Sequence, residues 1–319
     1  MDLLNIKDLT TTFFARGGAV KAVDSLSLAL RKGRVLGLVG ESGCGKTMTA
    51  LSILNLVPYP GKIESGSIFF EGLDLLTLPP DEMRKIRGAR ISMIFQEPMT
   101  ALNPVFTVGN QIAEVLTTHQ AATHREALDR SIELLRSVGI PSPEKRSGEY
   151  PHQLSGGMRQ RVMIAMAIAC KPALILADEP TTALDVTIQA HILELLDRIQ
   201  QEMGMAMVLV THDLGLIAER ADEVAVMYAG KIVEQAETRE LFASPLHPYT
   251  RGLMASIPGP GAVRHARLKT IPGTVPRLSD LPAGCKFSPR CDRKTERCEV
   301  EPQLLEVKPG HLVRCWESG

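Results

Sequence analysis

Residues 40–47 read Gly40-Glu41-Ser42-Gly43-Cys44-Gly45-Lys46-Thr47, which fits the pattern G-x-x-x-x-G-K-[ST] of a phosphate-binding loop. An apolar run at residues 35–39 precedes this stretch, and a helix-like run at residues 48–54 follows it. A true phosphate-binding loop requires this strand–loop–helix context, which a chance match to the pattern usually lacks. The alternative, a glycine-rich turn without a ligand, fits the context less well.

The chemistry of this loop suits a nucleotide and its metal ion. Glycines let the backbone turn so that its N–H groups face an anion, and the N-terminus of the following helix adds positive potential there. Lys46 can neutralise charge on the β- and γ-phosphates, and the Thr47 hydroxyl can bind Mg²⁺. We therefore expect ATP and Mg²⁺ at this loop, with the nucleotide bound by Gly40, Ser42, Gly43, Gly45, Lys46 and Thr47.

The composition indicates a globular chain with a substantial core. The chain has 319 residues, of which 44% are hydrophobic, and its 36 Lys and Arg balance 36 Asp and Glu. Zero net charge and only 4% aromatic residues disfavour a protein that coats nucleic acid, and we expect no nucleic-acid partner. No apolar run reaches membrane-spanning length and no signal peptide is visible, so the sequence predicts a cytoplasmic protein.

The order of patterns along the chain predicts its organisation. Residues 3–39 read as short alternating strands, and Phe14 among them is our candidate for stacking on adenine, although core packing is the alternative. Residues 108–138 have helical periodicity, and residues 141–153 read as a loop. Strands and helices then alternate through residue 234, which is typical of a mostly parallel sheet flanked by helices. A shift to frequent prolines near residue 257 predicts a boundary between domains at 1–257 and 258–319.

An acidic pair follows a fully apolar strand at residues 173–177. Asp178 and Glu179 would stand where the sheet meets the nucleotide. Asp178 would reach Mg²⁺, directly or through water, and Glu179 would polarise the attacking water as a general base. Two surface acids at a strand end are the alternative.

The motifs together resemble the ABC-type ATPases. They are residues 40–47, Gln96, the run Leu154–Gln160, Asp178-Glu179, residues 183–185 and His212, in the family's order and at suitable spacing. The similarity covers roughly residues 1–257. It implies an α/β fold with a RecA-like P-loop ATPase core, an N-terminal antiparallel β subdomain and an inserted helical subdomain at about residues 97–170. It also implies ATP hydrolysis, because no catalytic position is degenerate.

The resemblance assigns roles that the residues alone would not. The signature residues Ser155, Gly156 and Gly157, with Gln160, would meet the γ-phosphate of ATP bound to a partner subunit, which suits a helix N-terminus. Three further residues complete the implied site: Gln96, a catalytic residue that senses Mg²⁺ or water; His212, a catalytic residue that contacts the γ-phosphate; and Asp185, at the seam of the dimer.

The second half of the chain resembles ATPase subunits of dipeptide, oligopeptide and nickel importers. The segments that carry this resemblance are residues 96–104, 244–250, 271–276 and 284–291. It implies a second, often different, ATPase subunit, two membrane-spanning permease subunits, an extracytoplasmic solute-binding protein, and a peripheral place on the cytoplasmic face of the membrane. The solute stays open. The alternative is a soluble ABC-type ATPase acting on DNA or ribosomes, but this chain has neither the insertions nor the second ATPase unit usual there.

Four of the six cysteines lie in the tail, at Cys285, Cys291, Cys298 and Cys315. A proline-rich segment of this size with little core usually needs a crosslink. Disulfides conflict with a cytoplasmic ATP site, and the spacing lacks the close pair typical of zinc sites. An iron–sulfur cluster accepts varied spacings, and some members of the importer family carry a [4Fe–4S] cluster in this extension. We therefore expect these four residues to bind such a cluster, with zinc or free thiols as alternatives.

Overall fold

The computed structural model describes residues 2–15, 18–182, 184–256 and 271–318. The chain divides into two compact units. The first unit comprises Met1–Leu30, Arg34–Leu76 and Leu209–Gly319, and the second comprises Arg31–Gly33 and Thr77–Val208. The predicted boundary between residues 257 and 258 lies outside the described residues.

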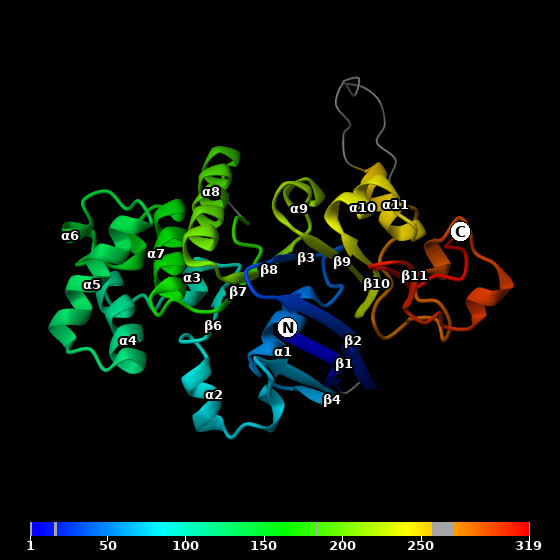
Figure 1. Cartoon of the computed structure of the whole chain (residues 1–319), viewed down its shortest axis with the longest axis horizontal. Helices are drawn as coiled ribbons and strands as arrows, with labels where there is room; N and C mark the ends of the chain where they lie inside the picture. The colour runs from blue at the N-terminus through cyan, green and yellow to red at the C-terminus, as the bar shows by residue number, and fades with distance from the viewer. Residues whose placement is uncertain (1, 16–17, 183, 257–270, 319) are drawn as a thin grey trace. The chain divides into compact units, whose positions relative to one another are not determined.

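An antiparallel sheet forms the N-terminal part of the first unit (Figure 1). Its strands, in the order β2-β1-β4-β5, are Gly18–Arg31, Asp2–Ala15, Gly61–Phe70 and Leu73–Asp74. The sequence predicts short strands here, but β1 and β2 are each 14 residues long. Threonines 10–12 interrupt the apolar alternation, yet β1 continues its pairing with β4 through them, past two shifts in register. The expected N-terminal antiparallel subdomain is confirmed.

The first unit also contains the strand that leads into the phosphate loop. Strand β3 (Val35–Val39) pairs in parallel with β9 (Glu223–Tyr228), and β9 pairs antiparallel with β10 (Lys231–Glu237). The tail adds two strands that the sequence does not predict: β12 (His311–Val313) pairs with β10, and β11 (Leu305–Lys308) pairs with β12. Both are too short for a hydrophobic period to reveal them. The helices of this unit are α1 (Lys46–Ile53), α9 (Leu214–Arg220), α10 (Thr238–Ala243) and α11 (Pro248–Ala255), and η3 (Ser288–Arg290) and η4 (Glu296–Glu299) are 3₁₀ turns.

The second unit combines a parallel strand pair with a helical region. Strands β6 (Ile91–Ile94) and β7 (Leu174–Asp178) pair in parallel, and β8 (Ala206–Thr211) crosses the division between the units. The helices are α2 (Pro80–Ile86), α3 (Pro98–Ala101), α4 (Val108–Gln120), α5 (His124–Ser137), α6 (Pro143–Arg146), α7 (Gly156–Ile168) and α8 (Val186–Met203). In Figure 1, α4, α5 and α7 lie side by side, as the expected helical subdomain.

The helical periodicity expected over residues 108–138 is confirmed, but the structure adds two details to this region. The helical stretch expected over residues 108–138 is two helices, because Ala121 adopts a left-handed conformation (φ 50°). Thr123 then forms a capping box with Glu126 that starts α5. The expected loop at residues 141–153 contains α6 and a short 3₁₀ turn. A one-turn helix lacks the length that periodicity needs.

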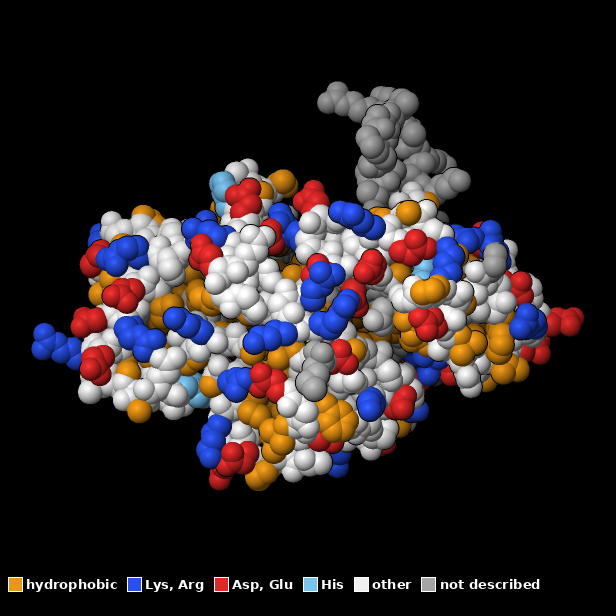
Figure 2. Space-filling model, in the orientation of Figure 1, with side chains coloured by type: hydrophobic (Ala, Val, Ile, Leu, Met, Phe, Trp, Pro, Cys, Tyr) orange, Lys and Arg blue, Asp and Glu red, His pale blue; other side chains and the backbone are white. Residues whose placement is uncertain are grey.

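Positive and negative side chains are interspersed over the face shown in Figure 2. Within the described residues, no helix combines the length and the apolar character that crossing a bilayer demands.

Candidate nucleotide-binding site

The phosphate loop lies between β3 and α1, as the sequence predicts. Gly43 and Gly45 have positive φ angles of 78° and 106°, which side chains other than glycine adopt at a cost. At Gly40 and Gly45, an added Cβ would stand 2.2 Å from the carbonyl oxygens of Met227 and Ala22 respectively. These glycines are therefore fixed by the close approach of neighbouring backbone.

The lysine of the loop is held by the loop itself. Lys46 Nζ donates to the carbonyl oxygens of Gly40, at 2.8 Å, and Glu41, at 3.2 Å. Its side chain is buried, whereas Ser42 and Gly43 at the crest of the loop are exposed. Thr47 lies in the first turn of α1 and is partly buried. Burial raises the pKa of the Cys44 thiol, so Cys44 stays neutral and packs as a small apolar residue.

Two other candidates belong to the same unit. Phe14 lies in β1 with 45% of its surface exposed, so its ring is free of the core that the alternative requires. His212 is exposed directly after β8, and the next residue, Asp213, accepts the N–H groups of Gly215 and Leu216 to cap α9.

Strand register brings Gln96 and Glu179 together in the second unit. Ile94 lies opposite Ala177 in the parallel β6–β7 pair, and each candidate follows its strand residue by two positions. Gln96 Nε2 donates to Glu179 Oε2 at 3.0 Å. Parallel strands end at the same edge of a sheet, which explains how residues 83 positions apart meet.

The backbone around Glu179 is unusual. Glu179 has φ of 43°, a left-handed conformation that non-glycine residues rarely hold except where the surrounding structure imposes it. Thr182 Oγ1 donates a second hydrogen bond to Glu179 Oε2 at 2.9 Å. The preceding carboxylate, Asp178, is 2% exposed. In the acidic pair, the carboxylate of Asp178 is therefore buried, and that of Glu179 is oriented by hydrogen bonds from Gln96 and Thr182.

The signature residues begin α7. Ser155 is its N-cap and accepts the N–H of Met158 at 3.4 Å. Ser155 and Gly156 are exposed, and a Cβ on Gly157 would stand 2.8 Å from Ile188 Cγ2, so α7 and α8 pack closely there. Gln160 is different, because it is 2% exposed and does not share the exposed end of α7.

Asp185 caps α8. Its Oδ1 accepts the N–H of Ile188 at 2.9 Å. Asp185 and the next residue, Val186, are exposed, with Val186 81% accessible. A seam of the kind the resemblance implies needs such an exposed surface.

The structure adds contacts to the phosphate loop that the sequence does not reveal. Glu41 N–H donates to the Tyr249 hydroxyl at 2.9 Å. The Glu41 carboxylate accepts two hydrogen bonds from Arg290, at 2.7 and 3.0 Å. Because more than 200 residues separate the partners, no local pattern could have indicated them.

The tail cysteines lie within electrostatic reach of one another. Burial, and then the neighbouring Cys298, Cys315 and Cys291, raise the pKa of Cys285 to about 11. Cys291 Sγ accepts the N–H of residue 293 at 3.4 Å, and Cys315 Sγ accepts that of residue 317 at 3.3 Å. Among the described residues, no three His, Cys, Asp or Glu side chains form a group that could hold a metal ion.

Comparison with known proteins identifies the family. Residues 23–182 match the family described as ABC transporter. This chain belongs to the ABC transporter family. Residues 233–298 also match a second family, the C-terminal region of oligopeptide/dipeptide transporters. The first match contains residues 40–47, Gln96, Leu154–Gln160 and Asp178-Glu179. The second match contains the tail segments at residues 244–250, 271–276 and 284–291.

Relatives of this ABC-type chain match it over nearly its whole length. A probable peptide ABC transporter ATP-binding protein, y4tR of Sinorhizobium fredii, is 51% identical over 99% of this chain and 95% of its own. The dipeptide transport ATP-binding protein DppD of Haemophilus influenzae is 52% identical over the same shares. A solved structure, the dimeric post-hydrolysis ATP-binding cassette MJ0796 bound to ADP and Pi, has a TM-score of 0.67 at 28% identity, covering 74% of this chain and 99% of that one. The chain is an ABC-type ATPase with the expected α/β cassette fold, and ATP with Mg²⁺ is its substrate.

Proposed function

We propose that this ATPase powers the import of dipeptides or oligopeptides through partner membrane subunits. The match of residues 233–298 to the oligopeptide/dipeptide transporter C-terminal region carries the proposal, because a generic ABC ATPase does not need this region. The names of the relatives agree with it. The alternative role on DNA or ribosomes has no comparable support.

In this function, the phosphate loop holds the triphosphate. Lys46 neutralises phosphate charge and Thr47 binds Mg²⁺, while Gly40, Ser42, Gly43 and Gly45 turn backbone N–H groups toward the phosphates, and Phe14 supports the adenine. In the second unit, Asp178 binds Mg²⁺ and Glu179 acts as the general base for water. The hydrogen bond from Gln96 to Glu179 supports a joint role in positioning that water. His212 is proposed to contact the γ-phosphate.

A second ATPase subunit, of the same or a different sequence, would complete the site. Ser155 and Gly156 are exposed at the start of α7, and Gly157 follows them in its first turn, which suits binding of a partner's γ-phosphate at the N-terminus of this helix. Asp185 lies on an exposed turn that could form the seam. The burial of Gln160 favours support of α7 over direct contact with ATP.

The second unit also offers an apolar surface for a membrane partner. Met99, Val105 and Phe106 follow Gln96 and are 52%, 70% and 51% exposed. Isolated exposed apolar residues need no explanation, but several in one short segment mark an interaction site. We propose that the permease subunits dock here, which places the chain peripherally at the cytoplasmic face of the membrane. An extracytoplasmic solute-binding protein would act only through those subunits.

We further propose that residues 1–257 form the nucleotide-binding domain, with its helical subdomain at about residues 97–170, and that residues 258–319 form the extension. The four tail cysteines would hold a [4Fe–4S] cluster. The proposal is supported by proximity, because the neighbouring Cys298, Cys315 and Cys291 help to raise the pKa of the Cys285 thiol. The N–H groups that donate to Cys291 and Cys315 are typical of sulfur atoms that ligate iron.

The function is tested by purifying the tagged chain from its native membranes in mild detergent. We expect integral membrane subunits to copurify, and dipeptide-loaded solute-binding protein to stimulate ATP hydrolysis in the reconstituted complex. Stimulation only by a nickel chelate would change the solute. Stimulation by nucleic acid, without membrane subunits, would favour the alternative.

The cluster is tested separately, on protein purified without oxygen. We expect about four irons and four acid-labile sulfides per chain. One zinc without sulfide would make the tail a zinc site, and neither metal would make the thiols free.

A further inference from the structure

Arg290 of the extension forms an ion pair with Glu41, the acidic residue of the phosphate loop. Its two terminal nitrogens contact the two carboxylate oxygens of Glu41 at 2.7 and 3.0 Å, a bidentate geometry that is stronger and more specific than a single contact. The Arg290 side chain is 4% exposed and that of Glu41 is 27% exposed. Water therefore screens this ion pair only in part.

The guanidinium is fixed on further sides. Arg290 Nε donates to the Pro272 carbonyl at 2.9 Å, and the guanidinium lies 5.9 Å from the centre of the Tyr228 ring. The ring of Tyr228 packs edge-on against Tyr249, whose hydroxyl accepts the Glu41 N–H. Both the backbone and the side chain of Glu41 are thus held by residues from the C-terminal part of the chain.

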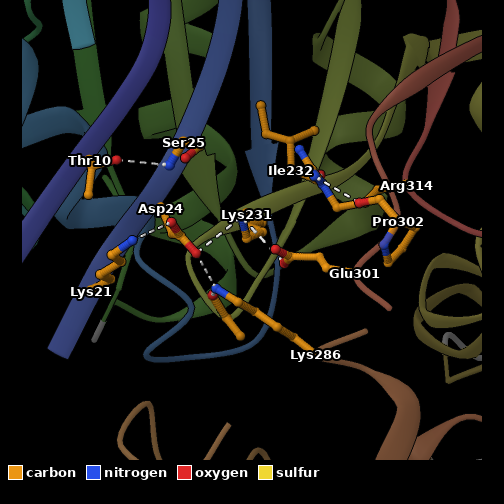
Figure 3. Close-up of polar contacts among 11 residues, drawn as sticks. Thr10, Lys21, Asp24, Ser25, Lys231, Ile232, Lys286, Glu301, Pro302 and Arg314 are labelled. Atoms are coloured by element: carbon orange, nitrogen blue, oxygen red, sulfur yellow. Dashed lines mark hydrogen bonds and ion pairs between the residues drawn. The ribbon is translucent and has the colours of Figure 1, made fainter. Parts of the chain in front are cut away.

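A second ion pair attaches the same segment of the extension. In Figure 3, Lys286 and Lys231 both point toward Asp24 of β2, and Glu301 pairs with Lys231. Lys286 Nζ lies 2.7 Å from Asp24 Oδ2 and 3.1 Å from the carbonyl of Ala229. Lys286 and Arg290 both lie between Cys285 and Cys291, so one short segment makes both attachments.

Charge gives the contact with Glu41 a consequence for the nucleotide. Glu41 is next to Gly40, whose carbonyl oxygen accepts a hydrogen bond from Lys46 Nζ. An unpaired carboxylate in a loop that binds a triphosphate would repel it through a partly desolvated site. Arg290 supplies the opposite charge, so the loop keeps its acidic residue without that repulsion.

We propose that the C-terminal extension is part of the nucleotide site, with Arg290 as a positioning residue that neutralises Glu41 and fixes the phosphate loop for ATP. This inference rests on the proposed function, in which that loop binds ATP. It makes the extension a determinant of ATP affinity.

The test compares ATP affinity of the full chain with Arg290→Gln, Glu41→Gln and the double variant. We expect Arg290→Gln to weaken ATP binding by about threefold to tenfold, more at low salt than at high salt. Glu41→Gln should bind ATP at least as tightly as the parent chain, and the double variant should recover most of the loss. Arg290→Lys, which keeps the charge but loses the bidentate geometry, should fall between. In the reconstituted complex, KM for ATP should rise while kcat is retained.

Controls separate the possible failures. Arg293→Gln removes a nearby exposed arginine of the extension and should leave affinity unchanged. Unchanged affinity in Arg290→Gln, or a double variant as weak as Arg290→Gln, would overturn the inference while leaving the proposed function intact. If the parent chain and Lys46→Ala bind ATP equally, the proposed function itself fails.

Discussion

The phosphate loop at residues 40–47 and the segment at residues 285–291 are organised in opposite ways. The lysine of the loop is held from within the loop, since Lys46 bonds carbonyl oxygens five and six residues away. The segment is held by partners far along the chain, because Arg290 and Lys286 contact residues 249 and 262 positions away. Contacts between residues that are close in the sequence can be predicted from a sequence motif. Contacts between residues that are far apart in the sequence become apparent only in the folded structure. The loop and the segment are in contact through Glu41 and Arg290. Substitutions on either side of this contact therefore compare the local and the long-range interactions.

The largest expected effect belongs to a locally organised residue. Glu179→Gln should slow ATP turnover in the reconstituted complex by roughly 10²–10⁴-fold while ATP stays bound, because the amide cannot accept the proton of water. Steady-state ATPase and nucleotide-binding assays measure the two properties. Glu194→Gln, on the exposed face of α8 in the same unit, is the matched control. A variant at 179 that retains its full rate would remove Glu179 from the role of general base.

Replacing the tail cysteines should have a smaller effect, on the affinity of the phosphate loop for ATP. Replacing Cys285, Cys291, Cys298 and Cys315 by serine should abolish iron binding and weaken ATP affinity about threefold to tenfold, as loss of the Arg290 contact does. Iron analysis and ATP titration on the same sample give both values. If the iron disappears and the affinity does not change, the extension is anchored independently of its cysteines.

The hydroxyl of Tyr249 tests the backbone half of the contact. Tyr249→Phe should leave the Glu41 N–H without its acceptor, which costs about 1 kcal/mol, or roughly fivefold in ATP affinity if the loop alone bears it. Isothermal titration with ATP measures this change. Tyr59→Phe, at a tyrosine that is 95% exposed, provides the control. Equal effects of both substitutions would show that the loop does not depend on this hydrogen bond.

The last effect concerns not ATP binding but the free energy of unfolding, which should depend on pH. Burial lowers the pKa of His247 from 6.5 to about 3, and its Nδ1 accepts the N–H of Tyr249 at 3.0 Å. Below pH 6.5, His247 therefore binds a proton in the unfolded chain, whereas in the folded chain it binds one only near pH 3. Stability should fall as pH drops through this window, by up to about 1.4 kcal/mol per pH unit.

Urea unfolding at several pH values between 7.5 and 4.5 measures that slope. His247→Asn keeps a side chain able to accept the capping hydrogen bond but does not titrate, so its slope should be shallower. Equal slopes for both proteins would contradict the role of His247.

The ATPase core was predictable because its signals are local or periodic. The phosphate loop follows a five-residue buried strand, and Gln96 and Glu179 follow two parallel strands in register. The division between α4 and α5 was missed because a single left-handed residue, Ala121, causes it. The contacts of Glu41 with Tyr249 and Arg290 could not be predicted, since no pattern within a window contains both partners. The burial of Gln160 likewise follows from packing, not from its place in the motif.

Strand β12 has a consequence for solubility. By pairing with β10, it covers backbone groups that would otherwise form the open end of that sheet. In the described part of the chain, the open end is instead β11, which has only four residues and carries Glu306 and Lys308. Short, charged edge strands resist pairing with other molecules. A chain shortened to end before Leu305 should therefore expose the longer edge of β10, which has seven residues, and should aggregate at concentrations at which the full chain stays dispersed.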